Sequence, residues 1–415
     1  MELTTIVLAV AAIAGLYMAW NIGANDVANA MGTSVGSGAL TLRRAIIVAA
    51  IFEFGGAMLV GGTVTKTIRK GIVDVGAFGD DPMVVAIGMT CCLLAAALWL
   101  NIATFAGWPV STTHSIVGAV VGFGLVAGGI DAVNWSVMAK IVGSWVVSPL
   151  MGGVIGYSSF VFIKRRILNV DRPLLALRGW GPIMVFPIFS ILALSVLFKG
   201  LKPLKLDLAL GPALGIAVAT GLLASFISVP LLRRFTQIAS KDKDERIYRA
   251  ERVFLVLQVL TACFVAFAHG SNDVANAVGP MAAVFGATSG ELGSEVAVPH
   301  RILLIGAIGI VVGLATYGYK IMATVGKKIT ELTPSRGFAA EFGAATTIVL
   351  ASKLGLPVST THTLVGAVIG VGFARGIGAI NTRVVSGIVA SWFITVPFTA
   401  ILAAVLFAIG RIWLP

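Results

Sequence analysis

Long apolar stretches separated by short polar loops run through almost the whole chain. Twelve such stretches can be recognised. They cover residues 3–21, 45–62, 83–106, 110–130, 137–163, 181–198, 208–232, 253–269, 302–319, 339–354, 358–374 and 384–410. Several are close to 18 residues long, which is the lower range for a helix that crosses a bilayer. The pattern therefore predicts an all-α polytopic membrane protein with about twelve transmembrane segments.

The composition supports this interpretation. The chain is 58% hydrophobic and 12% charged, whereas a soluble domain carries about 25% charged residues. A net charge of +12 would favour nucleic-acid binding in a soluble protein. In a membrane protein, however, Lys and Arg collect in loops and set the orientation. We therefore expect a multi-pass integral protein of the cell membrane, in contact with the lipid bilayer and with no nucleic-acid partner.

The most polar sequence inside the apolar stretches occurs twice. Residues 23–32 read GANDVANAMG and residues 270–279 read GSNDVANAVG. The string PVSTTH occurs at residues 109–114 and again at residues 357–362. The first motif recurs at an offset of 247 (270 − 23) and the second at 248 (362 − 114). Because the offsets agree to one residue, the two motifs belong to one duplicated unit.

The duplication divides the chain into three expected parts. Residues 1–163 form a first membrane repeat and residues 253–415 a second. Residues 164–252 have no counterpart, and we interpret them as a connecting insert with two spans and a basic cytoplasmic loop. Seven Lys and Arg residues lie within 233–252, in agreement with the positive-inside rule. That rule alone does not decide whether the repeats are inverted.

Each copy places an aspartate between two asparagines in apolar sequence. These residues are Asn25, Asp26 and Asn29 in the first copy, and Asn272, Asp273 and Asn276 in the second. The preceding glycine suggests an unwound turn that opens a helix; the alternative is an ordinary helix N-cap. A charge at the bilayer centre costs at least ~2.5–3.5 kcal/mol on insertion scales. Two aspartates there need a partner, and a bound cation is the simplest one.

Hydroxyl side chains follow a proline in both copies, a pattern typical of a helix start. They are Ser111, Thr112 and Thr113, and Ser359, Thr360 and Thr361. Free N–H groups at such a start, with the positive end of the helix dipole, form an anion site. The alternative is that the hydroxyls only satisfy the backbone around a kink. We expect the Gly-rich segments 110–130 and 358–374 to be half-helices or re-entrant hairpins, since irregular backbone at membrane depth needs protein or a cavity around it.

Four further polar residues are candidates for coupling or gating. His114 and His362 each follow a hydroxyl cluster, and each is either a hydrogen-bonded structural residue or a proton carrier. Glu53 and Glu341 lie within apolar stretches. An ionisable residue there marks an ion pathway or a paired structural charge.

The charges narrow the class of function. Asp26 and Asp273 would repel an anion bound alone, whereas a cation alone would leave the two helix starts without a role. A cation together with an oxyanion satisfies both, as in ion-coupled secondary transporters with inverted repeats. Na⁺ is favoured because the candidate ligands are almost all oxygens.

At these residues the chain resembles the inorganic phosphate transporter (PiT) family, over residues 20–160 and 253–410. The resemblance implies symport of orthophosphate with Na⁺ or H⁺ by alternating access. It also implies about twelve segments in two inverted halves, both termini outside, and no organic cofactor. Sulfate remains an alternative substrate, because some relatives carry it, and a homodimer is the favoured oligomeric state.

Site residues are assigned on the residue pattern together with this resemblance. Phosphate ligands are Asn25, Asp26, Ser111, Thr112, Thr113, Asn272, Asp273, Ser359, Thr360 and Thr361. Na⁺ ligands are Asp26, Asn29, Asp273 and Asn276. The coupling or gating candidates are Glu53, Glu341, His114 and His362.

Two other classes of function fit the residues less well. A membrane hydrolase would use Ser111, His114 and Asp26 as a triad, but the whole set occurs twice and hydrolysis needs one active site. A channel would conduct phosphate independently of a cation gradient. We therefore predict a transporter and no enzymatic activity.

Overall fold

The computed structural model describes residues 3–61, 71–73, 78, 81–197, 208–236, 242–290, 298–353 and 358–413. Every regular element in these ranges is a helix, apart from one isolated bridge between Val73 and Val133. The helices of the first repeat are α1 (Leu3–Gly36), α2 (Leu42–Val60), α4 (Pro82–Ala106), α5 (Thr112–Gly128) and α6 (Trp135–Ile163). Next come α7 (Pro173–Ser195) and α8 (Leu210–Phe235). The rest are α9 (Lys243–Asp273), α10 (Ala275–Thr288), α11 (His300–Thr316), α12 (Tyr319–Ala323), α13 (Pro334–Lys353), α14 (Thr360–Arg375) and α15 (Thr382–Gly410).

The lengths and apolar composition of these helices are those of a multi-pass integral membrane protein. Seven helices of the described chain are long and apolar enough to cross a membrane, or eight if the bent pair α11–α12 counts as one span. The sequence predicted about twelve. Two of the missing spans are α5 and α14, with only 17 and 16 residues. A third is α2, which contains Arg43, Arg44 and Glu53 within 19 residues.

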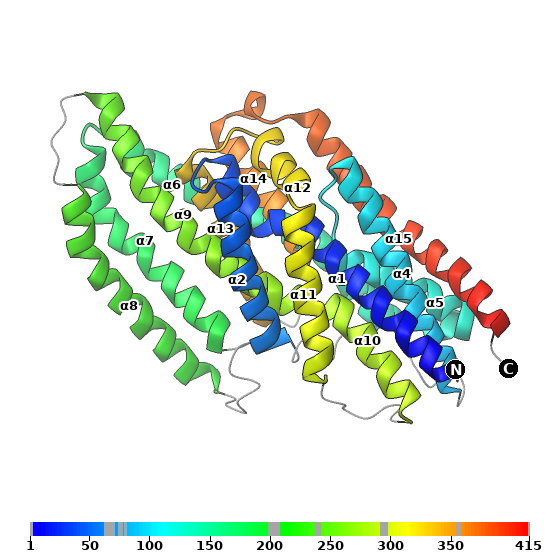
Figure 1. The fold of residues 1–415 in the computed structure, drawn as a ribbon. Helices are drawn as coiled ribbons and strands as arrows, with labels where there is room; N and C mark the ends of the chain where they lie inside the picture. The colour runs from blue at the N-terminus through cyan, green and yellow to red at the C-terminus, as the bar shows by residue number, and fades with distance from the viewer. Residues whose placement is uncertain are drawn as a thin grey trace.

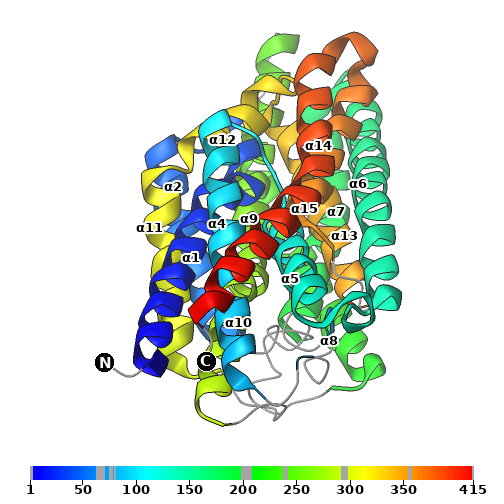
Figure 2. The ribbon, with the colours of Figure 1, turned by 90° about the vertical axis from the view of Figure 1, so that its right-hand side faces the viewer.

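The helices of the two sequence copies interleave. Helix α1 packs against α11, and α2 packs against α9. In the same way α5 packs against α15, and α14 against α6. Figures 1 and 2 show these pairs side by side, with both termini at the lower end of the molecule and the first turns of α9 at the upper end. Each of these contacts joins one copy to the other, so the packed interior is built from both copies.

Two glycines make this interleaving close. A Cβ on Gly23 of α1 would lie 1.9 Å from the carbonyl oxygen of Ile310 on α11. A Cβ on Gly270 of α9 would lie 2.1 Å from the carbonyl oxygen of Glu53 on α2. Any larger residue would push these helix pairs apart, so both motif glycines serve backbone-to-backbone packing.

One local prediction was wrong. The glycine before each Asn-Asp pair was expected to unwind the chain, but α1 continues without interruption from Leu3 to Gly36. A break occurs only in the second copy, where α9 ends at Asp273 and α10 begins at Ala275. The first Asn-Asp pair therefore lies inside a helix and the second lies at the C-terminal end of α9, so neither pair caps the start of a helix.

Candidate functional site

The two hydroxyl clusters are matching helix starts. Ser111 and Ser359 are the N-caps of α5 and α14, and each accepts a hydrogen bond at 3.2 Å from the backbone N–H three residues later. Their backbone angles agree within a degree, at φ −82° with ψ 121° and 120°. Such a cap leaves further N–H groups of the first turn without a helical partner. The sequence predicted these helix starts, and the structure confirms them.

Asp26, in the middle of α1, joins the two helix starts. Its Oδ2 accepts a hydrogen bond from Thr112 at 2.7 Å, and its Oδ1 accepts one from Thr361 at 3.1 Å. Asn29, one turn later, donates to Asp26 at 3.1 Å and to Thr361 at 2.9 Å. Since Thr112 begins α5 and Thr361 lies in the first turn of α14, one buried carboxylate holds both copies of the hydroxyl motif.

The second copy makes the reciprocal contacts. Asn276 of α10 donates to Thr112 at 3.1 Å and to Thr113 at 3.3 Å. Asp273 accepts a hydrogen bond from Thr360 at 3.2 Å and another from its neighbour Asn272 at 2.9 Å. The two aspartates, predicted to share a cavity with the hydroxyls, thus do meet them in one buried cluster.

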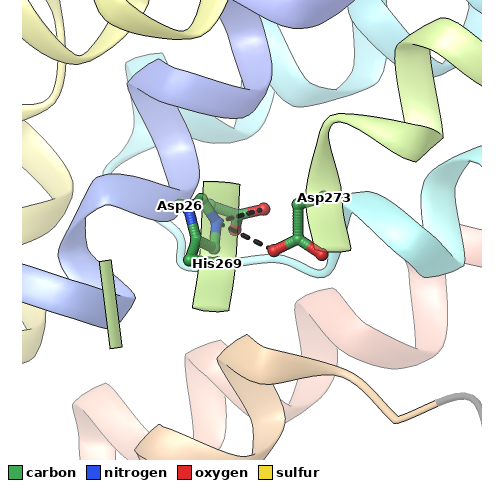
Figure 3. A group of neighbouring side chains, drawn as sticks. All are labelled: Asp26, His269 and Asp273. Atoms are coloured by element: carbon green, nitrogen blue, oxygen red, sulfur yellow. Dashed lines mark ion pairs between the residues drawn. The ribbon is translucent and has the colours of Figure 1, made fainter. Parts of the chain in front are cut away.

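His269 lies between the aspartates and was not among the site residues predicted from the sequence. Its Nε2 lies 2.8 Å from Asp273 and 3.7 Å from Asp26, and all three side chains are fully buried (Figure 3). Ligand atoms of these three residues lie within 4.8 Å of one another. The signal in the sequence was available: His269 precedes Asp273 by four residues, which places both on one face of a helix. The sequence predicted a bound cation as the simplest partner of the aspartates. The structure shows that the His269 imidazole is also a partner.

Glu53 is the other partner of His269. Its Oε1 lies 3.3 Å from His269 Nδ1, and its carboxylate has no hydrogen bond from any described residue. This pair exists in one copy only. Within the duplication His269 corresponds to Ile22 (269 − 247), and Glu53 corresponds to Ile310 when Arg44 is laid on Arg301 (53 + 257). The glycine contacts of Gly23 and Gly270 place these two pairs equivalently, so the charged pair of one side is an isoleucine pair on the other.

Asn25, which was expected to contact phosphate, contacts protein groups in this structure. Its Nδ2 donates to Thr104 at 2.9 Å and to the Trp108 carbonyl at 3.1 Å, while its Oδ1 accepts from the Val110 N–H at 3.2 Å. Its amide contacts thus go to the last turn of α4 and to the α4–α5 connection. We conclude that Asn25 fixes the loop that carries the first hydroxyl cluster.

Glu341 lies apart from the aspartates, in a polar cluster of its own. Its carboxylate accepts hydrogen bonds from Thr33 at 2.5 Å, from Ser34 at 2.9 Å and from Gln258 at 3.3 Å. It also accepts one from Thr261. Among the described residues no Lys, Arg or His forms an ion pair with it. The donors come from α1 and α9, so this carboxylate links α13 to both.

His114 and His362 contact each other edge to face and do not contact the aspartates. Their ring centroids are 4.4 Å apart; His114 also packs at a tilt against Trp145 at 4.0 Å, and His362 stacks on Trp392 at 3.7 Å. Trp392 also donates to the Pro109 carbonyl at 3.1 Å. This arrangement supports a structural role, in which the histidines hold the starts of α5 and α14 against each other.

The cluster is closed. A space of about 10 Å³ lies beside it, with Asn29, His269 and Thr360 among its lining residues. That is room for about one water-sized sphere. A tetrahedral oxyanion is larger than this space.

Comparison with known proteins identifies the family. The model of the phosphate transporter family matches residues 22–403, a range that contains both aspartates and both hydroxyl clusters. The chain belongs to the phosphate transporter family.

Relatives and a solved structure agree with this family. The chain is 47% identical to a relative from Pyrococcus abyssi whose name assigns it provisionally as a phosphate permease, over 96% of both chains. It is also 47% identical to the chloroplastic inorganic phosphate transporter 2-1 of Arabidopsis thaliana, over 94% of this chain and 70% of that protein. A solved structure described as the sodium-dependent phosphate transporter shares 43% identity. It superposes with a TM-score of 0.88 over 99% of this chain and 100% of the other. These relatives are transporters and permeases.

Proposed function

We propose that the chain carries inorganic phosphate across the membrane together with Na⁺, by alternating access, with the two copies forming one site. The observation that carries the proposal is the meeting of both hydroxyl clusters at Asp26, through Thr112 at 2.7 Å and Thr361 at 3.1 Å. The solved relative described as sodium-dependent supports the same coupling ion.

The charges explain why anion and cation belong together. The helix starts offer N–H groups and hydroxyls, which suit an oxyanion. Asp26, Asp273 and Glu53 are three buried carboxylates with His269 as their shared basic partner. One imidazolium leaves an excess of negative charge, and burying unpaired charge is costly. Na⁺ ions at Asp26, Asn29, Asp273 and Asn276 would remove this excess and permit the anion to bind.

The same carboxylates favour phosphate over sulfate. Orthophosphate near neutral pH retains at least one P–OH group, which can donate a hydrogen bond to Asp26 or Asp273. Sulfate has no proton to donate, so its oxygens would face the carboxylate oxygens with no hydrogen bond between them. A site that accepts a hydrogen bond from phosphate should therefore bind sulfate, which lacks the donor, much more weakly.

The transport cycle follows from the closed arrangement. Helices α5 and α14 start at the same cluster, and Figure 2 shows α14 in the upper part of the molecule and α5 in the lower part. We infer two hairpins, α4–α5 and α13–α14, that enter the membrane from opposite sides as inverted repeats. Opening one of them would break contacts such as Asn29 to Thr361 or Asn276 to Thr112, and would expose the site to one side only.

Glu341 is a further residue that we assign to the coupling ion. A fully buried carboxylate with hydroxyl donors and no basic partner in the described chain holds either a proton or a cation. We assign it to Na⁺, because Thr33, Ser34 and Thr261 offer hydroxyl oxygens around it, and oxygens are the preferred ligands of hard cations.

Uptake of labelled phosphate into proteoliposomes, with and without a sodium gradient and with sulfate as competitor, tests the proposal. Native protein should concentrate phosphate only with inward sodium, and sulfate should compete weakly. Asp26→Asn and Asp273→Asn should each abolish the sodium dependence. Uptake driven by a proton gradient alone would favour H⁺ coupling, and full sodium-coupled uptake in both variants would refute the assigned sites.

A further inference from the structure

A cleft of about 310 Å³ lies between the α7–α8 insert and the repeats. Three helices line it: Ser158, Ser159, Phe162 and Ile163 from α6, Ile183, Met184 and Pro187 from α7, and Phe338 and Phe342 from α13. Apart from the two serines, every lining residue is apolar. The cleft is separate from the cluster around Asp26 and shares no residue with it.

The cleft lies near one membrane surface. Ile163 is the last residue of α6, and the basic π-helical turn Lys164–Leu168 follows it directly. Pro187 lies 14 residues (187 − 173) after the start of α7 at Pro173, which is about 21 Å along a helix. The cleft thus spans about one leaflet, from the membrane boundary to about the bilayer midplane. This boundary is the one with the basic loops, so the positive-inside rule assigns it to the cytoplasm.

Basic side chains stand at this outer end. The guanidinium of Arg166 lies 5.6 Å from the ring centre of Trp180, which in turn contacts the lining residue Phe162 at 5.2 Å. Arg336 lies in the first turn of α13, two residues before the lining residue Phe338, and its guanidinium lies 5.9 Å from the Phe160 ring centre. No ion pair of Arg166 is found within the described chain.

The two nearby acids, Glu331 and Glu251, do not balance these charges, because Arg375 lies beside Arg336 as well. One oxygen of Glu331, Oε2, serves both Arg336 at 3.4 Å and Arg375 at 2.8 Å. Lys164 and Arg165 add two further positive charges on the turn that carries Arg166. An apolar cleft in one leaflet therefore ends in a surplus of positive charge at the level of the lipid headgroups.

We propose that this cleft binds an anionic phospholipid, with one acyl chain between α6, α7 and α13 and its phosphate against Arg166 and Arg336. The apolar walls suit hydrocarbon, and the basic end suits a headgroup with net negative charge, since basic pockets between helices on the cytoplasmic side bind such headgroups. The lipid would contact Phe342, the neighbour of Glu341 on α13. It would therefore fasten the insert to a helix that carries a coupling residue.

Native mass spectrometry of the purified full chain tests the proposal. Delipidated protein in a mild detergent is titrated with phosphatidylglycerol and, separately, with phosphatidylcholine of the same acyl chains. The native chain should retain phosphatidylglycerol in preference. Arg166→Gln with Arg336→Gln should weaken that binding by about fivefold for each arginine removed, while Arg411→Gln at the other end of the molecule should leave it unchanged. Ser159→Trp, which fills the cleft, should reduce the binding of both lipids.

Several outcomes would overturn the proposal. Equal retention of the two lipids by the native chain would show that the headgroup is not recognised. Unchanged phosphatidylglycerol binding in the arginine pair or in Ser159→Trp would place the lipid elsewhere. A dimer that forms as lipid is removed would show that a second copy covers the cleft. Labelled phosphate uptake by the variants reports that they fold, so failure of the lipid site is distinguishable from failure of the transport proposal.

Discussion

The pair of His269 and Glu53 occurs in one copy of the duplication only. Substitution of these two residues gives the sharpest test of how the buried carboxylates are stabilised. His269 lies 2.8 Å from Asp273, 3.3 Å from Glu53 and 3.7 Å from Asp26. With an effective dielectric constant of about 20, Coulomb's law gives attractions of about 6, 5 and 4.5 kcal/mol for these three distances. Desolvation offsets much of this, but removal of the imidazole leaves three carboxylates with no basic partner among the described residues.

The two partners should therefore respond unequally to substitution. His269→Gln should destabilise the protein by about 3–5 kcal/mol, the usual cost of breaking a buried ion pair from one side. Glu53→Gln should lower the free energy of unfolding by clearly less, because His269 still pairs with both aspartates. The double variant should be more stable than the sum of the single effects by about 1–3 kcal/mol, as residues in contact commonly couple by that amount.

Equilibrium unfolding in detergent micelles, followed by tryptophan fluorescence, measures all four members of this cycle. Uptake assays on the same preparations should show that His269→Gln loses sodium-dependent phosphate transport. The other copy supplies matched controls: Ile22→Val and Ile310→Val each remove one methylene, cost about 0.5–1.5 kcal/mol and should keep sodium dependence. Additive effects of the two charge substitutions, or native stability of His269→Gln, would refute the argument that the imidazole is charged and shared.

Three further substitutions test the helix starts and the second carboxylate. Ser359→Ala removes an N-cap acceptor, so it should cost about 1 kcal/mol of stability and raise the KM for phosphate uptake; a native KM would contradict a role at the anion site. Trp392→Phe keeps the stack on His362 but loses the hydrogen bond to the Pro109 carbonyl, and should lower the free energy of unfolding by about 0.5–1.5 kcal/mol, measured in micelles. Glu341→Gln keeps the volume and removes the charge, so half-maximal uptake should need more sodium while the phosphate KM at saturating sodium stays the same. An unaltered sodium requirement would exclude Glu341 from coupling.

The repeated motifs made much of the site predictable. Helix starts at Ser111 and Ser359 follow from Pro-x-Ser-Thr-Thr, because proline near the first turn and a serine cap are local signals. The duplication then indicated that both clusters serve one site. We could also predict that Asp26 and Asp273 lie close to the hydroxyls. A charge inside apolar sequence has a high free-energy cost and therefore needs a polar partner.

Other features of the site depend on packing between distant segments and have no signal in the local sequence. The sequence pattern assigns Asn25 to phosphate, but its contacts to Thr104 and Trp108 arise from the way α4 lies against α1. The glycine before Asn25 was expected to unwind the helix. Its absent side chain instead admits the backbone of α11, and a sequence pattern alone does not separate these two uses of glycine.

The residues that differ between the two copies are the most informative about the direction of transport. Two identical halves related by inversion would give inward-open and outward-open states of equal energy, because every interaction broken on one side would re-form on the other. His269, Glu53 and Glu341 occur once each, and their counterparts in the other copy are Ile22, Ile310 and, at an offset of 248, Leu93. These three ionisable residues therefore have no ionisable equivalent in the other copy. A ligand shifts a two-state equilibrium by its difference in affinity for the states, and cations bound beside these single-copy carboxylates would supply that difference. Under the proposed function, the duplicated hydroxyl clusters would hold the anion in either open state, and the unduplicated charges would make the two open states respond differently to sodium.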